Sequence, residues 1–137
     1  MIYLDTCALV QVGIEGACER QAELTFAIAR HAVVDLSQVF QTPPRALPSD
    51  RLPAEDLRRI RETLALQGLK LLDGEEADRK LARLRGMYEP YIFALATYLL
   101  LPLPPWIPLK KGKDNWQTTA WAETSGGARA RVGEDHF

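Results

Sequence analysis

The strongest hydrophobic pattern of the chain lies between residues 84 and 106, which include three of the four tyrosines. Its apolar residues recur at steps of three and four, and this spacing predicts one face of an α-helix. Pro90 interrupts the pattern, so we expect the helix to kink or restart near Glu89, because proline removes a backbone donor. The residues predicted to pack in a core are Leu84, Tyr88, Tyr91, Leu95, Tyr98 and Trp106.

A second apolar pattern, over residues 2–40, predicts one long helix. Its apolar positions are three, four or seven residues apart, and charged residues such as Glu15 and Arg30 lie mostly between them. Gly13 and Gly16 are the weak point, since each costs about 1 kcal/mol relative to alanine in a helix interior. The first ten residues are rich in β-branched and apolar types, and a strand is the alternative there.

Between these patterns, residues 41–53 contain four prolines and predict a stiff, extended linker. Pro53 is suited to open a short helix whose apolar edge is Leu57, Ile60 and Leu64, and Gly68 is a natural stop. The predicted fold is therefore all-α: an irregular bundle of about three helices, the first long, the second short and the third kinked at its proline.

The polar and glycine-bearing sequence after Trp106 shows no periodicity. We expect a helical domain over residues 1–106 and a disordered or extended tail over residues 107–137. The PLPP run that precedes Trp106 predicts polyproline II structure. It could serve as a ligand for an SH3-like groove, or as a membrane-interface anchor assisted by nearby lysines; the plainer expectation is that Trp106 folds back onto the bundle.

Net charge, apolar run length and cysteine spacing limit the classes of function that the chain can have. A formal net charge of −1 provides no general attraction to nucleic acid. The longest apolar run is about a dozen residues, whereas a spanning helix needs about 20, and the first residues lack the basic region of a signal peptide. Cys7 and Cys18 would lie about 16 Å apart on one helix, too far for a disulfide. These features predict a soluble, cytoplasmic chain.

Candidate chemistry is sparse. A strand ending at Asp5 would resemble the start of a PIN-domain ribonuclease, in which this aspartate would bind magnesium, but no second strand followed by an acid is evident. His31 and Asp35 are four residues apart on a helix, without a third ligand at matching spacing. We find no phosphate-binding loop, catalytic triad or CxxC motif, and we expect no enzyme activity, no cofactor, no bound metal, no nucleic acid and no small-molecule substrate.

Four segments together resemble one family. They are DTCALVQVGIEGACERQAELTFAIARHAVVDLSQVF, TPPR, DRLP and LRGMYEPYIFALATYLLLPLPPW, in that order from Asp5 to Trp106. They are similar to the cytoplasmic tail of bacterial two-transmembrane potassium-channel-like proteins. In that family the tail follows two membrane helices and a selectivity filter. This chain has neither, so we expect a truncated or partial chain that cannot conduct ions by itself.

The resemblance implies a cytosolic assembly or regulatory domain, located at the cytoplasmic face of the inner membrane if it is attached to a channel. Channel subunits surround a symmetry axis, so we expect a homo-oligomer. The expected interface is a face of small residues on the long first helix: Cys7, Ala22, Ala29 and Ala32. If no second copy covers this helix, it has to fold back at Gly13–Gly16. A free-standing helical interaction module is the alternative to a channel domain.

Overall fold

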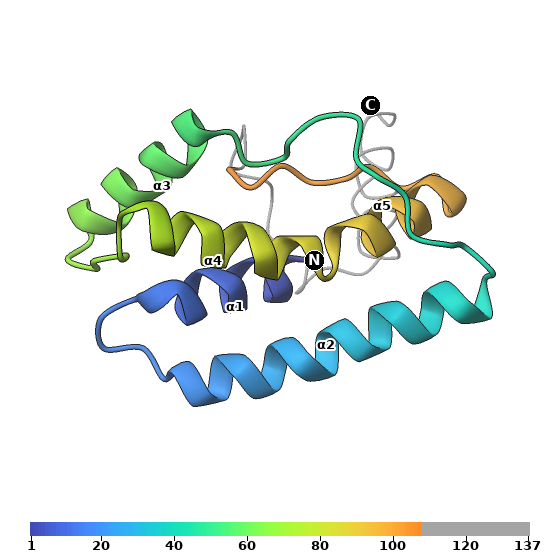
Figure 1. Ribbon diagram of the computed structural model, residues 1–137, viewed down its shortest axis with the longest axis horizontal. Coiled ribbons are helices and arrows are strands. Elements are labelled where there is room, and N and C mark those ends of the chain that lie inside the picture. The colour runs from blue at the N-terminus through green and yellow to red at the C-terminus, as the bar shows by residue number, and fades with distance from the viewer. Residues whose placement is uncertain (108–137) are drawn as a thin grey trace, which may run out of the picture. The chain divides into compact units, whose positions relative to one another are not determined.

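The structure is a computed structural model that describes residues 1–107, and this part of the chain is built from helices. The prediction of an all-α fold is therefore confirmed for these residues. The expected three helices are instead five: α1 (Ile2–Gly13), α2 (Glu19–Val39), α3 (Ala54–Leu66), α4 (Glu75–Gly86) and α5 (Glu89–Tyr98) (Figure 1). The predicted tail, apart from its first residue, lies outside the described residues.

The prediction of one long helix over residues 2–40 is wrong, because the chain reverses after Gly13. Gly13 has a φ of +128° and Gly16 a φ of +81°, conformations that residues with a side chain rarely adopt. Ile14 forms an isolated antiparallel bridge with Leu71, and the Leu72 amide donates to the Gly13 carbonyl at 3.0 Å. The reversal lays α2 alongside α1 (Figure 1). The alternative of an N-terminal strand is also wrong.

The predicted third helix is divided into α4 and α5. The helix α4 ends at Gly86, and α5 begins at Glu89 with Pro90 in its first turn. Proline is tolerated there, because the first amides of a helix have no intrahelical acceptor. Pro90 therefore accompanies a restart of the helix, one of the two outcomes that the sequence predicts.

The C-terminal ends of α2, α3 and α5 have a common geometry. In each, an amide donates to the carbonyl five residues earlier, at 2.8 to 2.9 Å, immediately after a residue with positive φ. This is the hydrogen bond of a Schellman motif, in which glycine is usual at the positive-φ position. The three positive-φ residues are Gln41 (51°), Gly68 (75°) and Leu100 (54°). Leucine at such a position is unusual, because its Cβ is strained there.

The core lies where α1 packs between α2 and α4, with α5 completing it against α2 and α4 (Figure 1). Leu4 and Ala8 on α1 and Tyr88 before α5 are almost completely buried. The rings of Phe26 and Tyr88 meet edge to face at 5.8 Å, an arrangement favoured by aromatic pairs. The short helix α3 adds the buried Leu57, as its apolar edge predicts.

The predicted core residues divide into three groups. Leu84, Tyr88 and Leu95 are buried, and Tyr91 and Trp106 are half-buried. Tyr98 is 57% exposed, so its assignment to the core is wrong. The helix α5 ends at Tyr98, and the side chain instead contacts the ring of Phe40 at 5.4 Å on the surface. Among residues 1–107, no helix is both long and apolar enough to cross a membrane.

Candidate functional site

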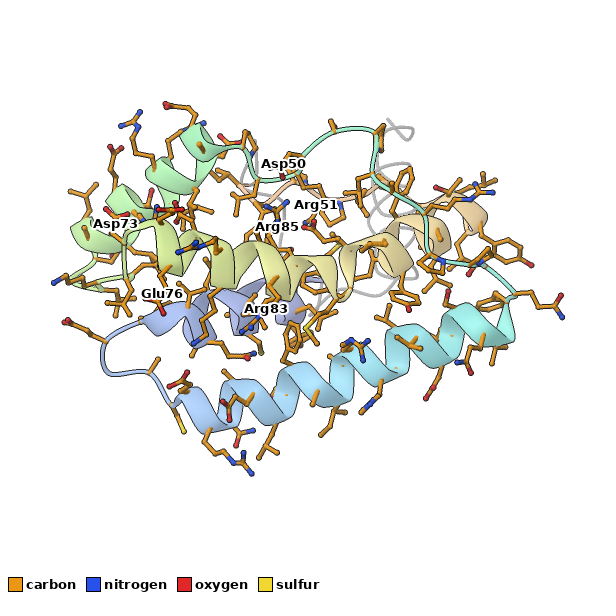
Figure 2. The ribbon with its side chains drawn as sticks, in the orientation of Figure 1. Asp50, Arg51, Asp73, Glu76, Arg83 and Arg85 are labelled. Atoms are coloured by element: carbon orange, nitrogen blue, oxygen red, sulfur yellow. The ribbon has the colours of Figure 1, made fainter. Side chains whose placement is uncertain are left out.

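Five charged side chains from distant parts of the sequence meet at one place, four of them largely buried and Asp50 58% exposed, and we call them the charged cluster. Asp5 comes from α1, Asp50 and Arg51 from the linker, Arg85 from the end of α4 and Glu89 from the start of α5. Figure 2 shows Asp50, Arg51 and Arg85 close together, away from Asp73 and Glu76 near the start of α4. The last described residues, Pro104 and Trp106, also contact this cluster.

Arg51 is the centre of the charged cluster, and only 7% of its side chain is exposed. Its Nη2 donates to Asp5 Oδ2 at 3.0 Å, and its Nη1 donates to Glu89 Oε1 at 2.7 Å. Nη2 also donates to the carbonyl oxygen of Pro104 at 3.1 Å. The planar guanidinium presents several donors in fixed directions. Arg51 thus joins the linker to α1, to α5 and to the segment that follows α5.

Glu89 receives hydrogen bonds from three other residues of the cluster region. Besides Arg51, its carboxylate accepts from Arg85 Nε at 3.1 Å and from the indole Nε1 of Trp106 at 3.3 Å. The Trp106 ring lies against both guanidiniums, 5.6 Å from that of Arg51 and 5.7 Å from that of Arg85. Such distances allow a cation–π attraction. Trp106 therefore covers the cluster with its apolar ring and satisfies it with its N–H group.

Tyr88 connects the cluster to the aromatic core. Its hydroxyl donates to Asp5 Oδ1 at 2.5 Å, while its ring packs on Phe26. Burial raises the pKa of the Tyr88 hydroxyl far above its ordinary value, and the nearby carboxylate of Asp5 raises it further. The Tyr88 hydroxyl is therefore protonated at neutral pH and serves as a hydrogen-bond donor to Asp5.

Asp50 and Arg85 form the solvent-facing edge of the cluster. Arg85 Nη2 donates to Asp50 Oδ1, which also accepts from the Leu52 amide at 2.9 Å. Burial opposes ionisation of Asp50, but the hydrogen bonds from Arg85 and Leu52 outweigh it and lower the pKa of this carboxyl. In Arg85, burial opposes the charge, but the hydrogen bonds that Arg85 donates to Glu89 and Asp50 outweigh this effect and raise its pKa.

This arrangement gives Asp5 a structural role that differs from the PIN-type hypothesis. Both of its carboxylate oxygens accept hydrogen bonds from Arg51, and Oδ1 also accepts one from Tyr88. Asp5 also lies on a helix, where the hypothesis requires the end of a strand in an α/β fold. Within residues 1–107, no group of three histidine, cysteine, aspartate or glutamate side chains is placed to hold a metal ion.

The other residues with candidate chemistry lie apart from the cluster. His31 and Asp35 are both exposed on α2. Cys7 is buried and Cys18 exposed, and both are free thiols. Burial raises the pKa of the Cys7 thiol, which disfavours the thiolate that a nucleophile needs.

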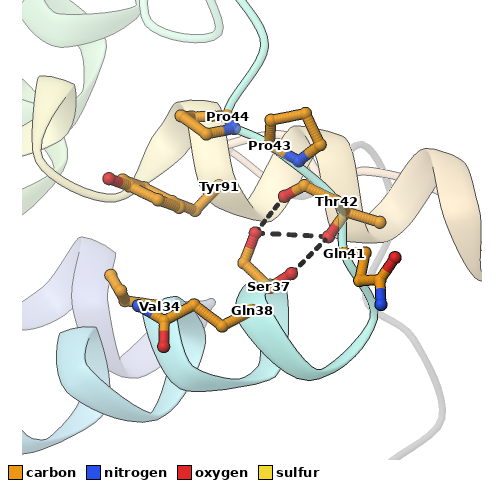
Figure 3. Close-up of a pocket in the computed structure, with 8 residues that line it drawn as sticks. All are labelled: Val34, Ser37, Gln38, Gln41, Thr42, Pro43, Pro44 and Tyr91. Atoms are coloured by element: carbon orange, nitrogen blue, oxygen red, sulfur yellow. Dashed lines mark hydrogen bonds between the residues drawn. The ribbon is translucent and has the colours of Figure 1, made fainter.

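An open hollow of about 400 Å³ lies where the end of α2, the linker and α5 meet (Figure 3). Ser37, at its wall, bonds to Thr42 through its hydroxyl and its carbonyl and so helps to close the end of α2. The residues that line it include no carboxylate, histidine or cysteine: Val34, Ser37, Gln38, Gln41, Thr42, Pro43, Pro44 and Tyr91. This composition provides no acid–base pair for catalysis.

The predicted oligomer interface is not one continuous surface. Cys7 and Ala22 are buried in the core of this chain, because the reversal at Gly13 packs α1 against α2. Ala29 is half-buried against the same core, and only Ala32 is exposed. The prediction that Cys7 and Ala22 face a second copy is wrong, since α1 and α2 of the same chain bury these residues against each other.

A different face of α2 carries exposed apolar side chains, which we call the α2 stripe. Its large members are Leu24 (45% exposed), Ile28 (71%) and Leu36 (47%), and Ala32 lies between them. They are spaced by four residues and therefore follow one side of the helix. Phe26 and Ala22 face the core instead. Within residues 1–107, the segments that contact α2 thus leave this apolar stripe exposed.

Sequence reasoning identified Tyr88 and Trp106 as packing residues but did not single out Arg51, Arg85 or Glu89. A detectable signal was present, because Glu89 and Asp5 each interrupt an apolar segment, and Arg51 directly precedes a leucine in DRLP. A charge inside an apolar segment needs a buried partner of opposite sign.

No protein-family model, curated protein or solved structure matches this chain.

Proposed function

We propose that the chain is a cytosolic assembly domain of a potassium-channel-like membrane protein, and that it associates with further copies through the α2 stripe. The observation that carries the assembly function is the row of Leu24, Ile28 and Leu36 on a helix of 21 residues, a row that the rest of residues 1–107 leaves exposed. Exposed apolar rows of this kind mark interaction surfaces more often than isolated apolar residues do. In the proposed homo-oligomer, the interface is this stripe and not the face of Cys7 and Ala22 that was expected from the sequence.

The channel part of the proposal rests on the resemblance, and the charged cluster supports treating the resembling segments as one unit. Asp5, Arg51, Glu89 and Trp106 all lie in those segments. Each of them contacts at least one other member of this set. A shared buried ion-pair network requires its members to be retained together, because one member alone would leave an unpaired buried charge.

Sedimentation equilibrium of the chain at tens of micromolar tests the assembly function. We expect an oligomer for the wild type and a shift to monomer for Ile28→Glu, because a glutamate in the stripe would have to be buried without a partner. The matched control is Leu66→Glu, since Leu66 is also a highly exposed leucine on a helix (84%) but lies on α3. Ala29→Glu is less suitable, because Ala29 packs partly against the core.

A monomeric wild type, or equal effects of Ile28→Glu and Leu66→Glu, would contradict assembly through α2. The channel part has its own test in the coding sequence directly upstream. Two in-frame hydrophobic segments of about 20 residues and a carbonyl-lined filter motif between them are the expected result. Their absence, combined with an oligomeric chain, would favour the free-standing helical interaction module.

A further inference from the structure

The segment that follows α5 reaches back to the charged cluster, and we call its residues 102–107 the strap. Figure 1 shows the strap in orange, running back from the end of α5 beside the linker. Within residues 1–107, two hydrogen bonds hold the strap to the rest of the chain: the Pro104 carbonyl accepts from Arg51, and the Trp106 indole donates to Glu89. The Trp106 ring also lies 5.6 Å from the guanidinium of Arg51. A few contacts near Trp106 therefore fasten the strap.

The charged cluster does not need the strap for its own ion pairs. Without the strap, Arg51 still binds Asp5 and Glu89, and Glu89 still accepts from Arg85. The strap is also loosely packed, because an open hollow of about 340 Å³ is lined by residues of both the strap and the linker. Release of the strap therefore leaves no buried charge without a partner, in contrast to the loss of Arg51. Segments with few buried contacts are the ones that open most readily.

The hinge of the strap lies at the end of α5, and it is strained. Leu100 has a φ of +54°, a left-handed conformation that brings the Cβ of leucine too close to a carbonyl oxygen. Its side chain is 91% exposed, so burial does not offset this strain. The turn is closed by the Leu101 amide, which donates to the Ala96 carbonyl at 2.9 Å. Opening the turn into an extended segment would return Leu100 to an allowed conformation.

We infer that two copies of this chain exchange their straps, so that Pro104 and Trp106 of one copy complete the charged cluster of the other. The contacts of the strap are the same within one chain and between two, whereas the strain at Leu100 is relieved in both hinges of the dimer. Short hinges under strain favour this kind of exchange. Three of the six strap residues are proline, so the strap is stiff and loses little conformational freedom when it docks. The exchange does not involve the α2 stripe and goes beyond the assembly proposed above.

Sedimentation equilibrium of the full chain tests the exchange in the Ile28→Glu background, in which assembly through the α2 stripe is removed. If the wild type is itself a monomer at tens of micromolar, the wild type serves instead, so the two proposals are tested separately. The series extends to about 1 mM, because a tethered segment competes at an effective concentration in the millimolar range. We expect a monomer–dimer equilibrium with a measurable dimer at the upper end of the series.

Two substitutions of Leu100 should change the dimerisation constant in opposite directions. Leu100→Gly relieves the strain in the closed monomer and should lower the constant by about ten-fold, since each dimer contains two hinges. Leu100→Pro cannot adopt a positive φ, so it opens the hinge and should raise the constant. An ordinary interface that buries the exposed Leu100 would instead be weakened by both changes. Circular dichroism of each variant checks that the helices are retained.

Leu99→Gly is the matched control, because it places glycine at the neighbouring position, whose φ of −85° is already allowed. It should not lower the dimerisation constant. The absence of a dimer up to about 1 mM, a constant lowered by both Leu100 variants, or equal effects of Leu100→Gly and Leu99→Gly would overturn the inference. None of these outcomes affects the comparison of Ile28→Glu with Leu66→Glu at tens of micromolar.

Discussion

Replacing Arg51 with methionine removes the centre of the charged cluster while keeping an unbranched apolar stem of similar length. In the wild type, Arg51 binds Asp5, Glu89 and the Pro104 carbonyl. In the variant, Glu89 keeps Arg85 as its cationic partner, whereas Asp5 keeps only the Tyr88 hydroxyl. The substitution therefore leaves one buried carboxylate without any positive partner.

The expected loss of stability follows from this orphaned carboxylate. Breaking a buried ion pair by removing one partner typically costs about 3–5 kcal/mol. The total stability of a domain of this size is about 5–15 kcal/mol, so Arg51→Met should lower the urea midpoint strongly or unfold the domain. The matched control is Arg79→Met, because Arg79 pairs with Glu75 on α4 but 72% of its side chain is exposed. Its loss should stay below about 1 kcal/mol.

A double-mutant cycle separates the ion pair from general effects of the substitution. Asp5→Asn removes the charge that Arg51→Met orphans and keeps an acceptor for Tyr88. The double variant should therefore be more stable than the sum of the two single losses predicts, by about 1–3 kcal/mol. Additive losses, or an Arg51→Met loss as small as that of Arg79→Met, would refute the view that Arg51 holds the cluster together.

Two further predictions concern Tyr88 and the helix ends. The pKa of Tyr88 is raised in the folded chain above its ordinary value of 10.0. The free energy of unfolding should therefore fall above pH 10 by up to about 1.4 kcal/mol per pH unit, because the unfolded chain loses this proton first. In urea unfolding at pH 9 to 11, the Tyr88→Phe variant should lack this pH dependence. Leu100→Gly should raise the free energy of unfolding by up to about 1 kcal/mol, because glycine relieves the strain of the left-handed conformation. Gly68→Ala should lower the free energy of unfolding by about 1 kcal/mol, because it introduces the same strain at the end of α3. Equal signs for these two variants in urea unfolding would contradict the strain argument.

The parts of the fold that the sequence predicts well are those with local causes. The helix α3 begins directly after Pro53, buries Leu57 and ends before Gly68, as the proline, the apolar spacing and the glycine indicate. The restart at Pro90 has the same local character. In these cases the residues that determine the element lie within it or next to it.

The reversal between α1 and α2 depends on residues more than fifty positions away. Gly13 and Gly16 mark a weak point in a helix, but their cost alone does not distinguish a tolerated glycine from a turn. The pairing of Ile14 with Leu71, and of the Gly13 carbonyl with the Leu72 amide, selects the turn. Periodicity describes one segment at a time and cannot reveal such a partner.

The charged cluster also depends on partners that are distant in the sequence, but it is held by ion pairs and hydrogen bonds. Apolar contacts are not directional, so the apolar stripes of α4 and α5 predict that these helices pack but not which neighbours they meet. Each hydrogen bond of Arg51 and Glu89, by contrast, requires one partner at one place. A charge within an apolar segment therefore shows that a buried partner exists, and the fold alone identifies it. In this chain the partners belong to five separate segments, and Trp106 closes the set by placing the last described residues against Glu89.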